Sequence, residues 1–77
     1  MSELEKSKLK KLGRTIKRTR REMGMTQARL AELIGVEVSH IWRLENGMSN
    51  MSLLTYWRLC EVLSFLEPFT LFNSLKP

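Results

Sequence analysis

The segment from residue 27 to residue 45, QARLAELIGVEVSHIWRLE, constrains the fold more than any other part of the chain. Apolar residues recur at helical spacing on both sides of Gly35-Val36, which predicts two short helices joined by a tight turn. We expect a positive φ at Gly35, where a side chain would be penalised. Ala31 lies where the two helices have to approach closely. The segment therefore meets the packing demands of a helix-turn-helix, with an apolar seam of Leu30, Ile34, Val36, Ile41 and Leu44.

The same spacing predicts a helix before this segment, over 8–23, and another after it, over 52–64. Gly24 ends the first helix, and Thr26 is the expected N-cap of the second helix, because its hydroxyl can accept a hydrogen bond from an unpaired backbone N–H. The third helix extends from about Glu37 to Glu45. Core positions expected on the fourth helix are Leu53, Tyr56, Leu59, Cys60 and Leu63.

The C-terminal segment allows two interpretations. Pro68 fits the first position of a short helix over 68–75, where its missing N–H has no consequence. The alternative is a strand over 69–72, because Phe69 and Leu71 alternate with Thr70 and Phe72, and the sequence leaves this choice open. With the helix, the fold class is all-α with five helices, in one domain over 8–77 that follows a flexible tail over 1–7.

The net charge of +5 is concentrated near the N-terminus, and a clustered positive field attracts a polyanion such as DNA or an anionic membrane. We expect no membrane contact, because the basic helix lacks aromatic residues and no apolar run is long enough to span a bilayer. The basic residues in this cluster are Lys6, Lys8, Lys10, Lys11, Arg14, Lys17, Arg18, Arg20 and Arg21.

The sequence offers no candidate catalytic or cofactor site. One histidine, one cysteine and no clustered carboxylates leave nothing for catalysis or for a metal ion, so we expect neither an enzyme nor a bound cofactor. The single cysteine, Cys60, cannot form an internal disulfide, and a reducing cytoplasm is therefore its expected setting.

From Leu12 to Phe72 the chain resembles the phage repressor and Cro-type helix-turn-helix proteins, known as the XRE family. The matching motifs are MTQARLAELIGV, SHIWRLENG, SLLTYWRLCEVL and PFTLF. The resemblance covers most of the chain. It implies a lambda-repressor-like domain of five helices that binds double-stranded DNA as a dimer and controls transcription.

The resemblance also implies roles for individual residues. An ion pair between Arg20 and Glu45 would tie the first helix to the end of the third. Arg43 would donate two hydrogen bonds to guanine, and Glu37 would accept from cytosine. The complete base-reading set is Glu37, Val38, Ser39, Trp42 and Arg43, and the expected phosphate contacts are Arg14, Lys17, Arg18, Thr26, Gln27, His40 and Asn46.

Three residues of the third helix depart from the family pattern. Glu37 stands where Ser or Thr usually caps the helix, Val38 where a polar base reader is usual, and Trp42 where a small polar residue is usual. Val38 and Trp42 form an apolar pair on the expected DNA face. They could contact thymine methyl groups or sugars, or they could bind another protein.

Large apolar residues remain after the core is assigned, and they predict a homodimer. A domain of this size cannot bury them all, and a contiguous exposed patch usually marks an interface. The alternative is that they fold back onto the monomer core. The expected interface residues are Leu54, Trp57, Phe65, Phe69 and Phe72.

Three regulatory settings remain open on the sequence alone: a prophage-type repressor, a restriction–modification controller, and an antitoxin with a toxin partner. A different class of function is a protein-interaction module that no longer binds DNA. The operator sequence and the choice between repression and activation do not follow from these residues.

Overall fold

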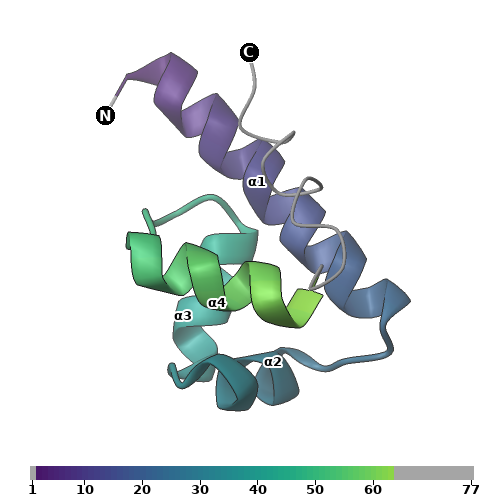
Figure 1. The fold of residues 1–77 in the computed structure, drawn as a ribbon. Helices are drawn as coiled ribbons and strands as arrows, with labels where there is room; N and C mark the ends of the chain where they lie inside the picture. Colours follow the sequence, from purple (N-terminus) through teal and green to yellow (C-terminus); the bar gives the residue numbers. More distant parts are fainter. Residues whose placement is uncertain (1, 64–77) are drawn as a thin grey trace.

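Four helices form the part of the chain that the computed structural model describes, residues 2–63 (Figure 1). They are α1 (Glu3–Glu22), α2 (Gln27–Ile34), α3 (Val38–Glu45) and α4 (Leu53–Leu63). No strand occurs within residues 2–63, which agrees with the predicted all-α class. The segment 68–75, predicted as a fifth helix or a strand, lies outside the described residues, as do Phe65, Phe69 and Phe72.

Helix α1 begins earlier than predicted. The tail expected over 1–7 is wrong for residues 3–7, which are helical. The Ser2 hydroxyl accepts a hydrogen bond from the Glu5 backbone N–H at 3.1 Å, and the Glu5 carboxylate accepts from the Ser2 N–H at 3.3 Å. This capping box satisfies two N–H groups at the start of the helix, so the helix forms there without an apolar pattern.

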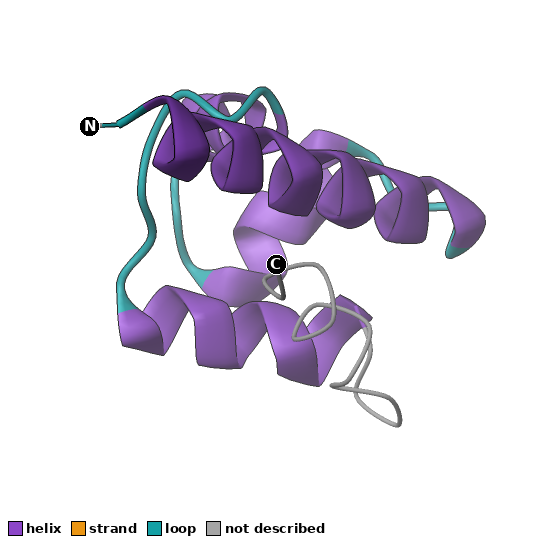
Figure 2. Ribbon diagram, turned by 90° about the horizontal axis from the view of Figure 1, so that it is seen from above, coloured by secondary structure: helices purple, strands orange, loops and turns teal. Residues whose placement is uncertain are grey.

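The core lies where the four helices meet. Helices α2 and α3 pack against each other, α1 packs mainly on α3, and α4 packs on α2. Figure 2 shows α1 along one side of the molecule and α4 along the other. The predicted apolar seam is confirmed, and Val36 packs against its buried members. The prediction that Leu53 belongs to the core is wrong, because its side chain is 82% exposed. The buried core is Leu12, Ile16, Leu30, Ala31, Ile34, Ile41, Leu44, Leu59, Cys60 and Leu63.

The turn between α2 and α3 has the backbone geometry that the sequence predicts. Gly35 has φ of 74° and ends α2 in the left-handed conformation. The Val36 N–H donates to the carbonyl of Ala31 at 3.0 Å, which closes the turn. From α4, the Arg58 guanidinium donates to the Ile34 carbonyl at 3.2 Å, so a second helix holds the end of α2 in place.

Helix α1 crosses the end of α3 at Gly13. A Cβ at this position would lie 2.6 Å from the carbonyl oxygen of Glu45 and closer still to that of Leu44. Only glycine therefore permits this approach, and the crossing fixes which side of α1 faces α3.

Residues 2–63 lack two kinds of feature, a membrane-spanning helix and a cluster of metal-binding side chains. No helix in this range is long and apolar enough to cross a membrane. No three His, Cys, Asp or Glu side chains in the same range gather as a metal site would require.

Candidate DNA-binding interface

The N-terminus of α2 is built around Thr26, as predicted. The Thr26 hydroxyl accepts a hydrogen bond from the Arg29 N–H at 3.0 Å and caps the helix. Thr26 is exposed at this end. Capping uses only one of the first N–H groups, so the start of α2 keeps a partial positive charge that favours an anion.

One side of α3 is buried and the opposite side is exposed. Ile41, Leu44 and Glu45 face the interior. The predicted base-reading residues are all exposed, and the helical part of the set forms one surface along α3, which we call the reading face: Val38, Ser39, Trp42 and Arg43. The structure thus brings these residues together, while their contacts with DNA remain a prediction.

Residues at the two ends of α3 complete this surface. Glu37 is the N-cap residue and is exposed, but its side chain makes no capping hydrogen bond. At the other end, the exposed Asn46 amide donates to the Trp42 carbonyl at 2.8 Å and stabilises the last turn. His40 is half-buried and lies beside the reading face rather than on it.

The predicted ion pair between Arg20 and Glu45 joins α1 to α3. The Arg20 Nε donates to Glu45 Oε2 at 2.7 Å and Arg20 Nη2 donates to Glu45 Oε1 at 3.1 Å, so the contact is bidentate. Both side chains are buried. Arg20 also donates to the Met25 carbonyl at 2.7 Å, which ties the loop before α2 to the same cluster.

Gln27 belongs to this cluster, which the sequence did not predict. Its Nε2 donates to Glu45 Oε1 at 3.0 Å, and the side chain is partly buried. An amide group has two N–H donors, so this bond leaves a second donor for the expected phosphate contact. Nothing in the local sequence pattern pairs residue 27 with residue 45; the contact follows from the packing of α2 against α3.

The basic residues of α1 divide between two sides of the helix. Lys10 and Lys17 lie three residues before and four residues after Gly13, so they share the side of α1 that meets the end of α3. A Cβ on Gly47, in the turn after α3, would lie 2.6 Å from Lys10 Cγ, which places Lys10 directly beside that turn. The sequence placed Lys10 in the basic cluster but did not include it among the expected phosphate contacts.

Arg14 and Arg18 follow Gly13 by one and five residues, so they are turned farther around α1 from the end of α3 than Lys17 is. Arg14 and Arg18 are exposed and line a shallow hollow on α1 together with Lys17, Arg21 and Glu22. Arg18 approaches the Glu22 carboxylate at 4.0 Å, an exposed pair one helical turn apart. Of the three α1 residues predicted to bind phosphate, Lys17 therefore has the position nearest to α3.

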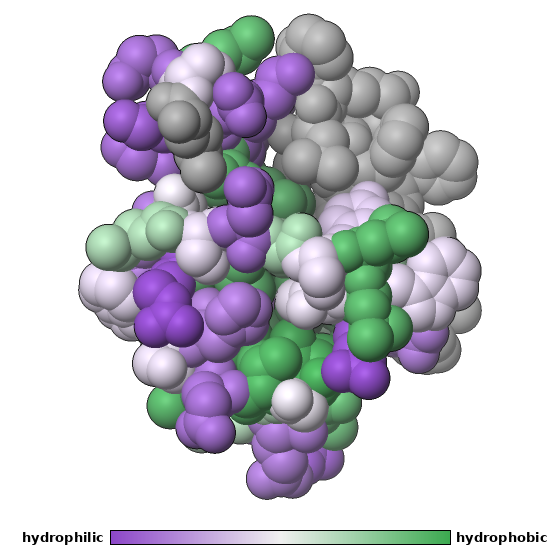
Figure 3. Space-filling view, turned by 90° about the vertical axis from the view of Figure 1, so that its left-hand side faces the viewer, coloured by the Kyte–Doolittle hydropathy of each residue, from purple (hydrophilic) through white to green (hydrophobic). Residues whose placement is uncertain are grey.

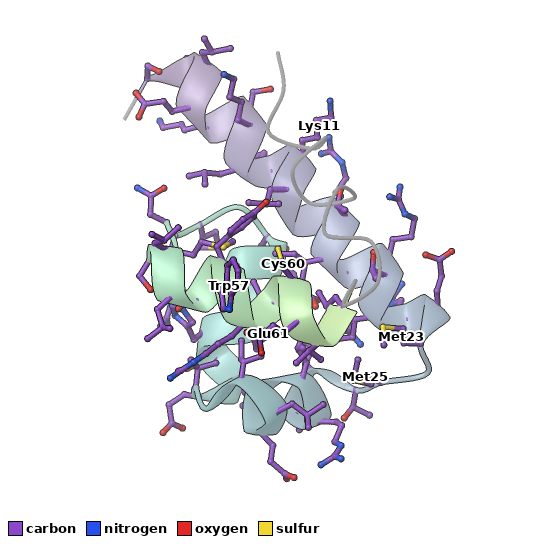
Figure 4. All side chains as sticks on the ribbon, viewed as in Figure 1. Lys11, Met23, Met25, Trp57, Cys60 and Glu61 are labelled. Atoms are coloured by element: carbon purple, nitrogen blue, oxygen red, sulfur yellow. The ribbon has the colours of Figure 1, made fainter. Side chains whose placement is uncertain are left out.

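A separate apolar surface lies on α4, which we call the α4 patch: Leu53, Leu54 and Trp57. These side chains are 82%, 56% and 62% exposed. Figure 4 shows Trp57 on the outer side of α4. Figure 3 views the molecule from the left-hand side of Figure 1, and strongly hydrophobic side chains are exposed on this face. The patch contains Leu54 and Trp57, which were predicted as dimer-interface residues. It also contains Leu53, which was predicted as a core residue.

Comparison with known proteins agrees with this arrangement. The family model described as a helix-turn-helix domain matches residues 11–68. The chain belongs to the helix-turn-helix domain family. Its structure is similar to that of the restriction–modification controller protein C.AhdI from Aeromonas hydrophila, with a TM-score of 0.79 and 33% sequence identity over 86% of this chain and 98% of that chain. No curated protein sequence gives a significant match.

The resemblance to XRE-type proteins is thereby confirmed. This helix-turn-helix domain is a DNA-binding domain and not an enzyme. Its all-α architecture is the lambda-repressor-like one of the controller protein.

Proposed function

We propose that this helix-turn-helix domain is a transcriptional regulator that recognises one double-stranded DNA sequence as a homodimer, in a restriction–modification system. The observation that carries the proposal is the similarity to C.AhdI, which extends over nearly all of that controller protein. Among the three settings that the sequence leaves open, this similarity favours the controller over a prophage repressor or an antitoxin.

The geometry supports DNA reading by α3. An α-helix fits the major groove, and the first residues of a recognition helix contact base edges there. With the reading face in the groove, Arg43 offers paired donors to guanine and Glu37 offers an acceptor to cytosine. The start of α2 and the Lys10 side of α1 would then lie against the flanking phosphates.

Selection of binding sites from a random duplex pool tests this proposal. We expect enrichment of one sequence with two-fold symmetry, its half-sites about one helical turn apart. A pool that remains unenriched at low salt, after rounds in which the folded protein is recovered, would contradict sequence-specific binding.

Homodimer formation is a distinct part of the proposal and rests on the α4 patch. Aromatic side chains that exclude water contribute strongly to interfaces, and Trp57 is the largest exposed one on α4. We expect the wild type to sediment as a dimer and a Trp57→Glu variant as a folded monomer.

The matched control for this experiment is Leu33→Glu. Leu33 on α2 is also apolar and 44% exposed, but it lies outside the α4 patch, so this variant should remain a dimer. Monomeric wild type at high micromolar concentration would refute the homodimer, and so would a folded Trp57→Glu variant that still dimerises.

A protein-interaction module, including an antitoxin, is the second candidate, and the exposed Val38 and Trp42 favour it. Titration with random duplex DNA at low salt separates the two. A DNA-binding domain binds any duplex through its phosphate contacts, with affinity that falls steeply as salt rises. Absence of such binding would favour the protein-interaction module.

A further inference from the structure

The reading face contains two large apolar side chains among polar ones. Val38 is 47% exposed and Trp42 is 49% exposed, although both side chains are large and hydrophobic. They lie four residues apart, and therefore on one side of α3, one helical turn from each other. Neighbouring exposed apolar side chains form a contiguous patch, and such patches often mark a binding surface.

The surroundings of this pair indicate what it contacts. Its neighbours on the exposed side of α3 are Ser39, Arg43 and Asn46, which are polar or charged. A stable protein interface buries about 800 Å² on each partner, usually around an apolar centre, and two isolated side chains provide only part of that. The α4 patch, by contrast, groups three such side chains and offers a surface suited to protein contact.

We propose that Val38 and Trp42 read the 5-methyl groups of thymine in the major groove. This inference rests on the proposed function and deepens it. The thymine methyl is the apolar group that the major groove of unmodified DNA presents, and apolar side chains recognise it by direct contact. The pair thus replaces hydrogen-bond readout with methyl readout at two positions, while Arg43 keeps a hydrogen-bonding role.

The spacing of the pair fixes the spacing of the bases. Four residues along an α-helix advance about 6 Å, and successive base pairs are about 3.4 Å apart. With α3 lying along the groove, the two methyl groups belong to thymines about two base-pair steps apart in each half-site. The thymine nearer the start of α3 is assigned to Val38, and the other to Trp42.

Replacement of thymine by uracil tests the contact, because uracil lacks only the methyl group and keeps every hydrogen-bonding atom. The duplex is the sequence selected by the wild-type protein, with one thymine at a time changed to uracil. A methyl group removed from water contributes about 0.8 kcal/mol, which is about fourfold in affinity. We expect about a fourfold loss at two thymines of each half-site and less than about twofold at the others.

Protein variants assign each methyl group to a side chain. Val38→Ser removes both methyl groups of the side chain, so the uracil effect should vanish at the Val38 thymine and persist at the other. With Trp42→Ala, the uracil effect should vanish at the Trp42 thymine and persist at the Val38 thymine. Leu33→Ala is the matched control: Leu33 is also an exposed apolar residue but lies on α2, outside the reading face, so this variant should leave both uracil effects unchanged. Circular dichroism tests whether each variant is folded. If Trp42→Ala unfolds, the uracil series and Val38→Ser still test the proposal.

Three outcomes distinguish failure of the proposed function from failure of methyl readout. A wild type that enriches no sequence refutes the proposed function and this inference with it. A wild type that selects a site yet binds its thymine and uracil forms equally leaves the regulator intact and overturns methyl readout. A uracil effect that neither variant alters overturns the assignment to Val38 and Trp42.

Discussion

Glu45 connects three helices through one carboxylate. Its oxygens accept hydrogen bonds from Arg20 on α1 and from Gln27 on α2, while its own backbone belongs to α3. Arg20 in turn holds the loop before α2 through the Met25 carbonyl. The orientation of the reading helix relative to α1 and α2 therefore depends on a single buried charge cluster.

Removal of one partner from this ion pair should be strongly destabilising, because a buried charge is then left without compensation. We expect Arg20→Met to lower the free energy of unfolding by roughly 3–5 kcal/mol in urea denaturation. The double variant Arg20→Met, Glu45→Leu should lose much less unfolding free energy than the sum of the losses in the two single variants. Strictly additive losses would contradict coupling between these side chains.

Gly13→Ala tests the crossing of α1 and α3. The added Cβ would press against the carbonyls of Leu44 and Glu45, which are backbone atoms at the end of the reading helix. We expect the unfolding free energy to fall by about 1–3 kcal/mol or more, although alanine favours helix formation. Lys11→Ala, at an exposed position of the same helix, is the control and should change stability by less than about 0.5 kcal/mol. A stabilised Gly13→Ala variant would refute the close crossing.

Alkaline pH should destabilise the domain through Cys60 and Tyr56. Burial raises the pKa of the Cys60 thiol above its ordinary value of 9.0, against a smaller opposing effect of its hydrogen bond with Tyr56. Burial and the same hydrogen bond raise the pKa of the Tyr56 hydroxyl above 10.0. Both groups ionise more readily in the unfolded chain, so their stabilisation is complete below these ordinary values and is lost as pH rises through the folded-state values.

Urea denaturation at pH 8 and at pH 10 measures this effect. The free energy of unfolding should be lower at pH 10, and a Cys60→Ala variant should show a smaller decrease over the same interval. Equal decreases in the two proteins would show that the thiol does not contribute.

Local chemistry made several residues predictable, whereas contacts between distant helices did not. The cap at Thr26 and the left-handed turn at Gly35 depend on neighbouring residues only. The Arg20–Glu45 pair followed from family resemblance. Gln27 and Gly13 depend on how α2 and α1 meet the end of α3, which no single segment encodes.

Two predictions about the helices were wrong, and each error has a physical cause in the helix concerned. Helix α1 starts at Glu3 because a capping box stabilises its first turn, although apolar periodicity is weak there. Leu53 fits the periodicity of α4 but is its first residue, where the helix extends past the core. Periodicity thus identified each described helix correctly, but it missed the first turn of α1 and the exposure of Leu53.

The two sides of α1 should differ in their contribution to DNA binding. Lys10 and Lys17 lie on the side that meets the end of α3, whereas Lys11 points away from α3 (Figure 4). Changing Lys10 and Lys17 to Gln together should reduce the slope of log affinity against log salt by roughly 2 per protomer, because each phosphate contact contributes about 0.9.

The control carries the same change of charge on the other side of the helix: Lys8→Gln with Lys11→Gln. Its salt slope should remain close to that of the wild type. Equal effects of the two double variants would mean that α1 contributes only a general positive field and that its orientation is irrelevant.

Two exposed surfaces of the molecule have different chemistry. The reading face is mixed polar and apolar and is flanked by the basic side of α1, while the α4 patch is apolar. The division suits a protein that contacts DNA with one surface and a second copy of itself with the other.

Base reading by the exposed side of α3 can be measured at Arg43. Equilibrium affinities of wild type and Arg43→Ala should be measured for the selected duplex and for each single base-pair change in it. At one G·C pair per half-site, substitution should weaken the wild type by about 1–3 kcal/mol and leave the variant nearly unaffected. An Arg43→Ala variant that binds every duplex more weakly by the same factor, as Arg14→Ala should, would contradict base reading by this helix.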